Sequence, residues 1–221
     1  LSEASSRKVL LIEAGRDISH TDVPAPVLDG YPAKAYFDRD LVWQDLRVKL
    51  GVERPGQQRN LSRYEQARLL GGGSAINGML ANRGAPADYD EWEILGAKGW
   101  GWAGVSPYFV KMERDLEFDD DFHGRVGPQT IGRLAPGDIS RVVRAVCDVL
   151  AEEGFPLRPD QNGAWTEGNF RTTLTLDEEG RRAPVSLTYL TPSVRARANL
   201  AILTDTLVTK ILFDNGRAIG V

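Results

Sequence analysis

The sequence predicts an α/β fold, on the evidence of one apolar strand-like run and one strongly amphipathic helix. Residues 9–12, Val-Leu-Leu-Ile, form a continuous apolar run, which is typical of a strand buried in a parallel sheet. Apolar residues recur at helical spacing over 139–150, and this pattern predicts a helix that Asp138 caps and Gly154 ends. Further strands are predicted over 171–176 and 200–204.

The composition is that of a globular protein with a sizeable core. The chain has 221 residues, 42% apolar and 26% charged, which suits one large or two modest domains. A net charge of −4 argues against nucleic acid or an anionic membrane surface as the main partner. No apolar run approaches the roughly 18 residues of a membrane span. The single cysteine, Cys147, excludes an intrachain disulfide framework and is expected to be a packed, inert thiol.

Weak periodicity and many Pro, Gly, Asp and Arg residues over about 17–66 predict long surface loops of the lid or binding-loop type.

Short helices are predicted over 88–95 and from Ser106, with Ser106 as N-cap and Pro107 in the first turn. Pro192 breaks any helix over 186–198. Near the C-terminus we expect a strand over 207–213, a tight turn at 214–216 and a return strand. Because the chain stops within that strand, we expect an internal piece of a longer protein.

Two segments carry residues suited to binding a nucleotide. Glu13 follows the strand at 9–12, where dinucleotide-binding folds place an acid on the adenosine ribose, although an incidental carboxylate would fit equally. Gly71-Gly72-Gly73-Ser74 lets a ligand approach the backbone closely, and the amides at the start of the following helix suit a phosphate or a ring edge. The alternative is a glycine-rich connection that binds nothing. The segment is not a Walker A loop.

The acidic stretch over 113–121 lacks the spacing of a calcium-binding loop, so it is interpreted as a solvated face. His123 has no second histidine nearby, and no metal site is predicted. The absence of a Gly-x-Ser-x-Gly motif weakens a hydrolase interpretation.

Residues 67–90, ARLLGGGSAINGMLANRGAPADYD, resemble the first signature of the glucose-methanol-choline (GMC) family of flavin oxidoreductases. Residues 9–15, VLLIEAG, and the stretch 199–221 resemble two further segments of that family. The resemblance implies a discontinuous Rossmann-like FAD-binding domain over 1–153 and 199–221, without its first strand and its Gly-rich loop. Residues 154–198 would then be part of a substrate domain built on an antiparallel sheet, so the fold is incomplete.

The resemblance also implies roles for individual residues. Glu13 would bind the adenosine ribose and Gly15 would permit the close turn after it. Backbone donors beside the reduced isoalloxazine can stabilise its negative charge. The implied FAD contacts are, for the pyrophosphate and ribityl chain, Gly72, Gly73 and Ser74; for the isoalloxazine, Asn77, Gly78, Met79 and Leu80; for the adenine, the backbone of Val208; and, as a further contact, Arg68.

Two departures from the family pattern matter. Ile76 occupies the position of the histidine that tethers the flavin in some members, so we expect noncovalent FAD. Residues 64–67 differ from the usual Pro-Arg-Gly before the signature. The family's phosphate-binding glycines would precede Leu1, and its catalytic His with a His or Asn partner would follow Val221. No catalytic residue is therefore assigned in this chain, which we expect to be inactive alone.

The resemblance implies a piece of an FAD-dependent alcohol oxidoreductase, choline dehydrogenase-like, that transfers hydride from a CH–OH group to flavin N5. Alternatives are a flavin-dependent hydroxynitrile lyase, whose substrate would not bleach the flavin, and a noncatalytic remnant that binds no flavin. An NAD-linked dehydrogenase would explain Glu13 at the end of the strand, but it would not explain the glycine-rich segment 71–77. The alcohol, the electron acceptor, the oligomeric state and the compartment are left open, and for the compartment the cytoplasm is favoured. No secretory signal is present, but the start of the chain, which has no initiator Met, says little about the compartment.

Overall fold

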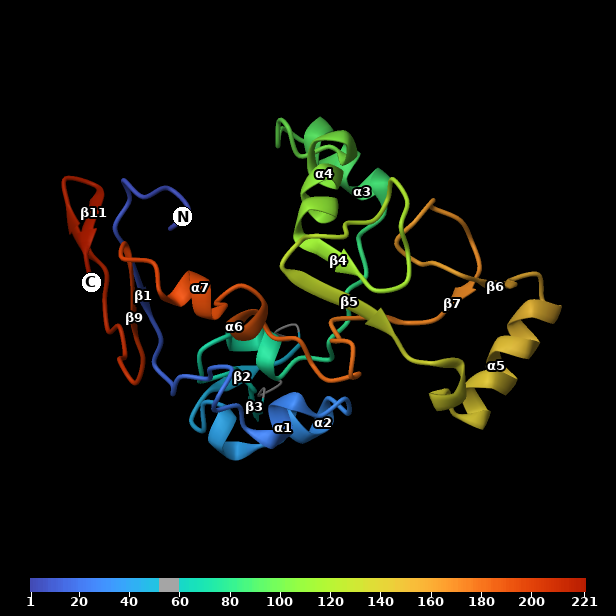
Figure 1. The fold of residues 1–221 in the computed structure, drawn as a ribbon, viewed down its shortest axis with the longest axis horizontal. Coiled ribbons are helices and arrows are strands. Elements are labelled where there is room, and N and C mark those ends of the chain that lie inside the picture. Colours follow the sequence, from blue (N-terminus) through green and yellow to red (C-terminus); the bar gives the residue numbers. More distant parts are fainter. Residues whose placement is uncertain (52–59) are drawn as a thin grey trace. The chain divides into compact units, whose positions relative to one another are not determined.

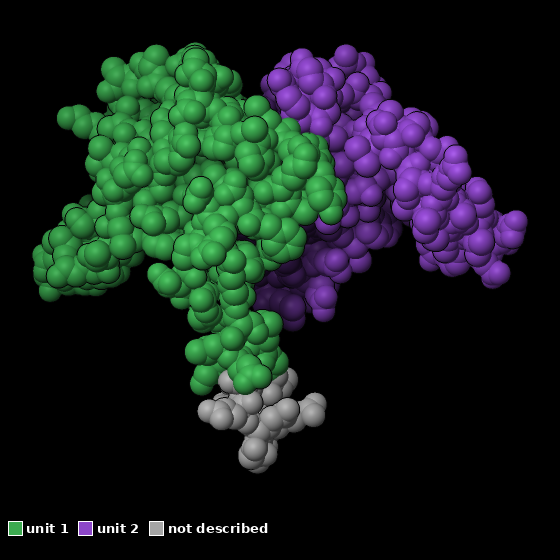
Figure 2. Space-filling model, turned by 90° about the horizontal axis from the view of Figure 1, so that it is seen from below, with its two compact units in different colours: residues 1–78, 184–221 green, residues 79–183 purple. Residues whose placement is uncertain are grey.

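The computed structural model describes residues 1–51 and 60–221, which form two compact units (Figures 1 and 2). Unit 1 comprises residues 1–78 and 184–221, so it is assembled from both ends of the chain. Unit 2 is the continuous segment 79–183. Both units contain helices and strands, which confirms the predicted α/β class.

Unit 1 is organised around a pair of parallel strands. β1 (Val9–Ile12) pairs with β9 (Leu200–Leu203) in a register that sets Val9 opposite Leu200. The predicted strand over 9–12 and its parallel pairing are thus confirmed. Its side chains are only partly buried, and Leu10 is 54% exposed, because β9 is the one strand paired with β1 among the described residues. The remaining elements of unit 1 are α1 (Ala25–Leu28), α2 (Ala33–Tyr36), η1 (Arg39–Leu41), β2 (Arg47–Lys49), β3 (Leu61–Arg63), η2 (Gly72–Ala75), α6 (Val185–Thr188), α7 (Pro192–Arg195), β10 (Leu212–Asp214) and β11 (Arg217–Gly220).

The region 17–66 supplies much of the core of unit 1, whereas surface loops were expected there. Within its described part, α1, α2 and η1 turn apolar side chains inward, and none of these elements is long enough to show a helical period. Residues 52–59 of this region lie outside the described residues. The buried cluster comprises Ile18, Val27, Ala35, Leu41, Val42, Leu69, Leu70, Ala75 and Ile76.

The C-terminal part of unit 1 follows the prediction in its turns and departs from it in one strand. Asn215 and Gly216 both have positive φ, 47° and 76°, as a two-residue type I′ hairpin turn requires. Residues 207–211 are not in a strand, so β10 is shorter than expected. Pro192 occupies the first turn of α7 and separates it from α6, as predicted.

Unit 2 is built on the three-stranded order β4-β5-β8, in which β5 is parallel to β4 and antiparallel to β8. The strand predicted over 171–176 is confined to the two residues of β8. In Figure 1, α5 lies beside β6 and β7, apart from the α3–α4 pair. The elements of unit 2 are α3 (Pro86–Ile94), α4 (Trp102–Met112), β4 (Glu113–Asp115), β5 (Gln129–Arg133), η3 (Pro136–Asp138), α5 (Arg141–Glu152), β6 (Leu157–Arg158), β7 (Asn169–Phe170) and β8 (Thr173–Leu174).

Two predicted helix starts are wrong. α4 begins at Trp102 rather than after Ser106, because Asp90 Oδ1 on α3 accepts a hydrogen bond from Trp102 N at 2.8 Å and caps the helix earlier. Pro107 therefore lies inside α4. α5 is capped by Ser140, whose Oγ accepts from Val143 N at 3.3 Å, and not by Asp138. Among the described residues, no helix has the length and apolar character needed to cross a membrane.

Candidate functional site

The turn after β1 holds the Glu13 carboxylate in a defined position. Glu13 Oε1 accepts a hydrogen bond from Gly15 N at 2.8 Å, so one carboxylate oxygen is engaged within the turn itself. The turn is also attached to the segment that follows β9. Thr206 N donates to Glu13 O at 3.0 Å and Asp205 N donates to Gly15 O at 2.8 Å. The half-buried carboxylate is therefore fixed by local bonds before any ligand arrives.

Gly15 is required by its contact with the backbone of Arg68. A Cβ atom at position 15 would lie 1.9 Å from Arg68 O, a distance that no side chain tolerates. An isolated parallel bridge pairs Arg16 with Leu69, and Leu70 N donates to Arg16 O at 2.9 Å. Arg68 Nε in turn donates to Ala14 O at 3.3 Å. The chain from 67 to 70 thus runs directly beside the Glu13–Gly15 turn.

The glycine turn begins where that chain segment ends. Gly71 and Gly72 have φ angles of 104° and 54°, in the left-handed region that favours glycine. The helix expected after this turn is a four-residue 3-10 helix, η2, and not an α-helix. A Cβ at Gly71 would lie 2.9 Å from Ser186 Oγ, so Gly71 is set by packing. At Gly72 and Gly73 a Cβ would meet nothing within 4 Å, so these two glycines border open space.

Ser74 and Asn77 are tied to the same turn by hydrogen bonds. Ser74 Oγ donates to Gly71 O at 2.6 Å and accepts from Val185 N at 3.0 Å, which fastens the turn to α6. Asn77 N donates to Gly73 O at 2.8 Å, while Asn77 and Gly78 are exposed. Ile76, in contrast, is buried in the core of unit 1. The side chain of Ile76 thus serves packing.

The remaining candidate residues are divided between the two units. Val208 lies in unit 1, two residues after the Thr206 amide that is bonded to Glu13. Met79 and Leu80 belong to unit 2. Met79 has a φ of 62° and is 1% exposed, because its side chain packs against Leu174 and Leu176. The candidate residues that belong to unit 1 are Glu13, Gly15, Arg68, Gly72, Gly73, Ser74, Asn77, Gly78 and Val208.

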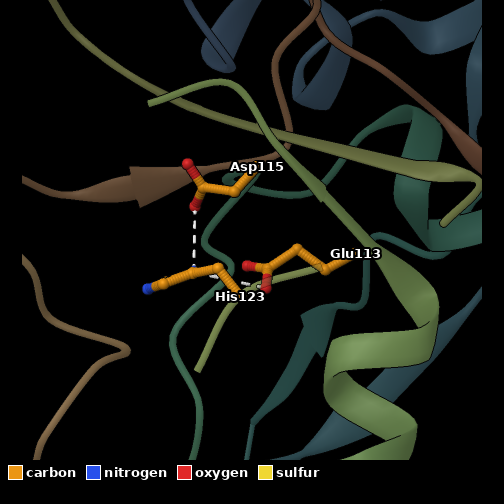
Figure 3. A group of neighbouring side chains, drawn as sticks. All are labelled: Glu113, Asp115 and His123. Atoms are coloured by element: carbon orange, nitrogen blue, oxygen red, sulfur yellow. Dashed lines mark ion pairs between the residues drawn. The ribbon is translucent and has the colours of Figure 1, made fainter. Parts of the chain in front are cut away.

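Unit 2 contains a buried ionic cluster that the sequence interpretation missed (Figure 3). Glu113 and Asp115 on β4 are 2% and 7% exposed, so the interpretation of the whole acidic stretch as a solvated face is wrong. The His123 ring lies between them, with Nδ1 at 3.3 Å from both Glu113 Oε2 and Asp115 Oδ2. Its Nε2 lies 3.0 Å from Asp160 Oδ2. The i, i+2 spacing of the two acids on a strand placed both side chains on one face and was the available signal.

Two arginines complete the cluster. Arg133 pairs with Asp115 at 2.9 Å and Asp160 at 3.1 Å, and Arg83 pairs with Glu113. Burial by itself lowers the pKa of His123, but hydrogen bonds with Asp115, Asp160 and Glu113 outweigh it and raise the pKa to about 11. Burial alone would raise the pKa of Asp115, but bonds from His123 and Arg133 hold it well below its usual range.

The same atoms have the spacing of a metal-ligand set, since one atom each of Glu113, Asp115 and His123 lies within 4.8 Å of the others. The charges of this cluster favour a protonated His123 over a bound metal ion. Three carboxylates face two guanidiniums and one imidazolium, which is an electrically balanced set, and both candidate carboxylates already accept hydrogen bonds from arginines. A divalent cation would be held next to two fixed positive charges. We therefore assign this cluster to the structure of unit 2.

Comparison with known proteins decides the family. Residues 11–221 match the family described as GMC oxidoreductase. The chain belongs to the GMC oxidoreductase family. Two curated relatives in this family cover the whole chain: the 5-(hydroxymethyl)furfural oxidase of Methylovorus sp. (strain MP688), 42% identical over 224 residues, and the oxygen-dependent choline dehydrogenase of Vibrio vulnificus (strain YJ016), 32% identical over 221 residues.

A solved structure agrees with this GMC assignment. The crystal structure of pyridoxine 4-oxidase from Mesorbium loti matches 99% of the chain with a TM-score of 0.84 at 29% identity. The chain spans only 42% and 38% of the lengths of the two curated relatives and 41% of the solved chain. These three proteins therefore contain substantial polypeptide that this chain does not match.

Proposed function

We propose that the protein containing this chain is an FAD-dependent oxidoreductase that oxidises a CH–OH group of a small-molecule alcohol. The members of the GMC family are FAD-dependent, and relatives of this chain are named for hydroxymethylfurfural and choline. Bound FAD supplies the electron chemistry by accepting hydride at flavin N5. In this proposal, the chain itself binds and orients the cofactor, and the general base comes from polypeptide outside these residues.

The observation that carries the proposal is the fastening of the Glu13–Gly15 turn to the glycine turn in unit 1. The bonds from Leu70 N to Arg16 O and from Arg68 Nε to Ala14 O place the two turns on adjoining backbone segments. A dinucleotide needs both features near each other: an acid for the ribose hydroxyls and close-approach backbone for the phosphates. This chain provides both within one compact unit.

The residues present suit FAD. Glu13 keeps one carboxylate oxygen in its own turn, and we propose that the other accepts from the adenosine ribose. Gly72 and Gly73 border open space, and we propose that the pyrophosphate and ribityl chain pass there, with Ser74 holding the turn in place. In the same proposal Val208 offers its backbone to the adenine, and Asn77, Gly78, Met79 and Leu80 border the isoalloxazine.

We propose noncovalent attachment of the flavin. The side chain at position 76 is an isoleucine, which has no atom that can bond to the flavin, and it is buried in the core of unit 1. Acid precipitation of the purified full-length holoprotein should therefore release all FAD into the supernatant. Flavin that stays with the polypeptide after denaturation would contradict this attachment.

We also propose that residues 1–153 and 199–221 serve the cofactor and 154–198 the substrate. The compact units divide elsewhere, at 78/79 and 183/184, since they follow internal packing and not ligand contacts. Because the chain lacks a recognisable general base, the chain alone should be inactive. Turnover of an alcohol by a verified 221-residue protein would contradict this expectation.

The experiment that tests the proposed function is an FAD titration of the full-length apoprotein. Glu13→Ala should raise the Kd for FAD by roughly 10-fold or more, since a hydrogen bond to a charged acceptor contributes about 1.5–3 kcal/mol. Glu3→Ala, an exposed acid in the same unit, is the matched control and should leave the Kd unchanged. An unchanged Kd for Glu13→Ala would remove Glu13 from the site.

A substrate panel should follow the titration. 5-(Hydroxymethyl)furfural and choline come first, because they appear in the names of the relatives at 42% and 32% identity. An oxidisable alcohol should bleach the flavin absorbance of the holoprotein under anaerobic conditions. A protein that binds FAD but is bleached by no alcohol, while it cleaves a cyanohydrin, would be a lyase instead.

A further inference from the structure

The chain segment that begins at Met79 runs along β8 in unit 2. Met79 O accepts a hydrogen bond from Thr175 N at 2.9 Å, and Ala81 N donates to Thr173 O at 2.9 Å. A trans peptide sets its N–H opposite its C=O, and the described chain contains no cis peptide. Because the neighbouring groups of Met79 and Ala81 point toward β8, the N–H and C=O of Leu80 both point away from that strand.

The side chain of Asn162 extends this row of hydrogen bonds. Its Nδ2 donates to Ala81 O at 2.9 Å, and its Oδ1 accepts from Arg83 N at 3.0 Å. A carboxamide carries a donor and an acceptor side by side, so it can replace the backbone of a neighbouring strand. The reversed amide would set oxygen against oxygen, so these partners fix its orientation. We call this pair of bonds the Asn162 clamp.

The backbone of Asn162 is bonded to the buried ionic cluster. Asn162 N donates to Asp160 Oδ1 at 3.0 Å, and Asp160 is paired with His123 and Arg133. Arg83, another member of the cluster, donates from its guanidinium to Asn162 O at 3.2 Å. Asn162 is only 4% exposed. The clamp and the segment that it holds are therefore both attached to the cluster.

We propose that Asn162 is a positioning residue for the flavin, whose clamp holds the backbone of Leu80 toward the isoalloxazine. This inference rests on the proposed function, in which Met79 and Leu80 border that ring. The side chain of Leu80 is 63% exposed, so its backbone is not enclosed by unit 2. A donor that is fixed before reduction stabilises the negative charge of the reduced ring better than one that must first be ordered. Asn162 itself acts through the segment and contacts no flavin.

Redox titration of the full-length holoprotein, against a reference dye that sets the potential, tests the proposal. At a given potential, the ratio of reduced to oxidised flavin in Asn162→Ala should be about fivefold below that of wild type, the effect of about one hydrogen bond. Asn169→Ala is the matched control, because Asn169 Nδ2 on β7 also donates to a backbone carbonyl of unit 2, that of Phe155. Its ratio should equal that of wild type.

Hydrogen exchange of the wild-type protein provides a second test, which does not depend on the folding of a variant. The peptide that contains Ala81 and Arg83 should exchange slowly in the full-length apoprotein, because the acceptors of both amides belong to unit 2. Slow exchange that appears only after FAD is added would show that the flavin orders this segment, and it would overturn the proposal. If Asn162→Ala does not retain FAD, this measurement decides.

The remaining outcomes separate this inference from the proposed function. A wild-type ratio in Asn162→Ala would overturn the positioning role and leave FAD binding intact. An equal fall in Asn169→Ala would indicate a general loosening of unit 2 and would also overturn it. A full-length wild-type protein that binds no FAD would reject the proposed function, and this inference with it. A fall in Asn162→Ala alone, with slow exchange in the apoprotein, supports the proposal.

Discussion

Arg195 donates hydrogen bonds to both carboxylate oxygens of Asp17, at 2.8 and 2.9 Å, across 178 positions of sequence. A third bond runs from the same guanidinium to Ile18 O at 2.9 Å. Arg195 belongs to α7, and Asp17 follows the Glu13–Gly15 turn by two residues. This forked contact therefore fastens the C-terminal part of unit 1 to the chain that leaves the proposed ribose site.

The first prediction concerns this contact. Arg195→Ala should lower the free energy of unfolding by about 1 kcal/mol, a modest value because the Asp17 side chain is 42% exposed and water screens the pair. Urea unfolding of the full-length protein provides the measurement. Lys210→Ala removes an exposed positive charge from the same unit and serves as control. Equal midpoints for the two variants would show that the contact contributes nothing.

The second prediction distinguishes a glycine that is required by close packing, Gly15, from a glycine that is proposed to contact FAD, Gly73. Gly15→Ala should destabilise the protein by about 1–3 kcal/mol, because its Cβ would collide with the Arg68 backbone. Gly73→Ala meets nothing within 4 Å and should leave the unfolding midpoint nearly unchanged. The same Gly73→Ala variant should nevertheless weaken FAD binding by about tenfold or more, if the pyrophosphate passes there. Normal FAD affinity in Gly73→Ala would move the cofactor away from this glycine.

The third prediction concerns pH. His123 has a pKa of about 11 in the folded protein against 6.5 in an unperturbed state, so folding takes up a proton between these values. Its stabilising contribution is complete below pH 6.5 and declines as the pH rises toward 11. Between pH 6 and 9 the stability advantage of wild type over His123→Gln should shrink by about 1 kcal/mol or more.

Urea unfolding at several pH values checks this expectation. His20→Gln, at the exposed second histidine of the chain, is the matched control and should follow wild type across the range. Parallel pH curves for wild type and His123→Gln would contradict a charged imidazole in the cluster.

The fourth prediction concerns the cap of α4. Asp90→Ala removes the acceptor for Trp102 N and should cost about 1 kcal/mol of stability. Glu91→Ala alters an exposed neighbour on the same helix and is expected to have little effect. Thermal unfolding followed by circular dichroism distinguishes the two. A variant at position 90 that melts with wild type would leave the early start of α4 without this explanation.

Local patterns in the sequence predicted the local parts of the fold. The apolar run at 9–12, the Asn215–Gly216 turn and the amphipathic helix near 141–152 all follow from neighbouring residues, and each occurs. The family resemblance, rather than periodicity, identified the candidate cofactor residues. It placed Glu13 and the glycine turn in one site before their physical connection through residues 67–70 was visible.

Other features depend on contacts between distant residues. The core contribution of 17–66 comes from short elements without a measurable period. The ionic cluster joins Arg83 to Glu113 across 30 positions and His123 to Asp160 across 37 positions, so no local window contains it. The Gly15–Arg68 contact is of the same kind, since a glycine in sequence does not reveal which backbone approaches it.

The pairing of Val9 with Leu200 also sets an order of events during synthesis. β9 is synthesised well after β1, because the whole of unit 2, residues 79–183, lies between them in the sequence. In that interval the backbone groups of β1 that pair with β9 are open to other polypeptides. The parallel pair at the proposed ribose site therefore requires the closure of a long loop, with the high contact order typical of slow-forming sheets.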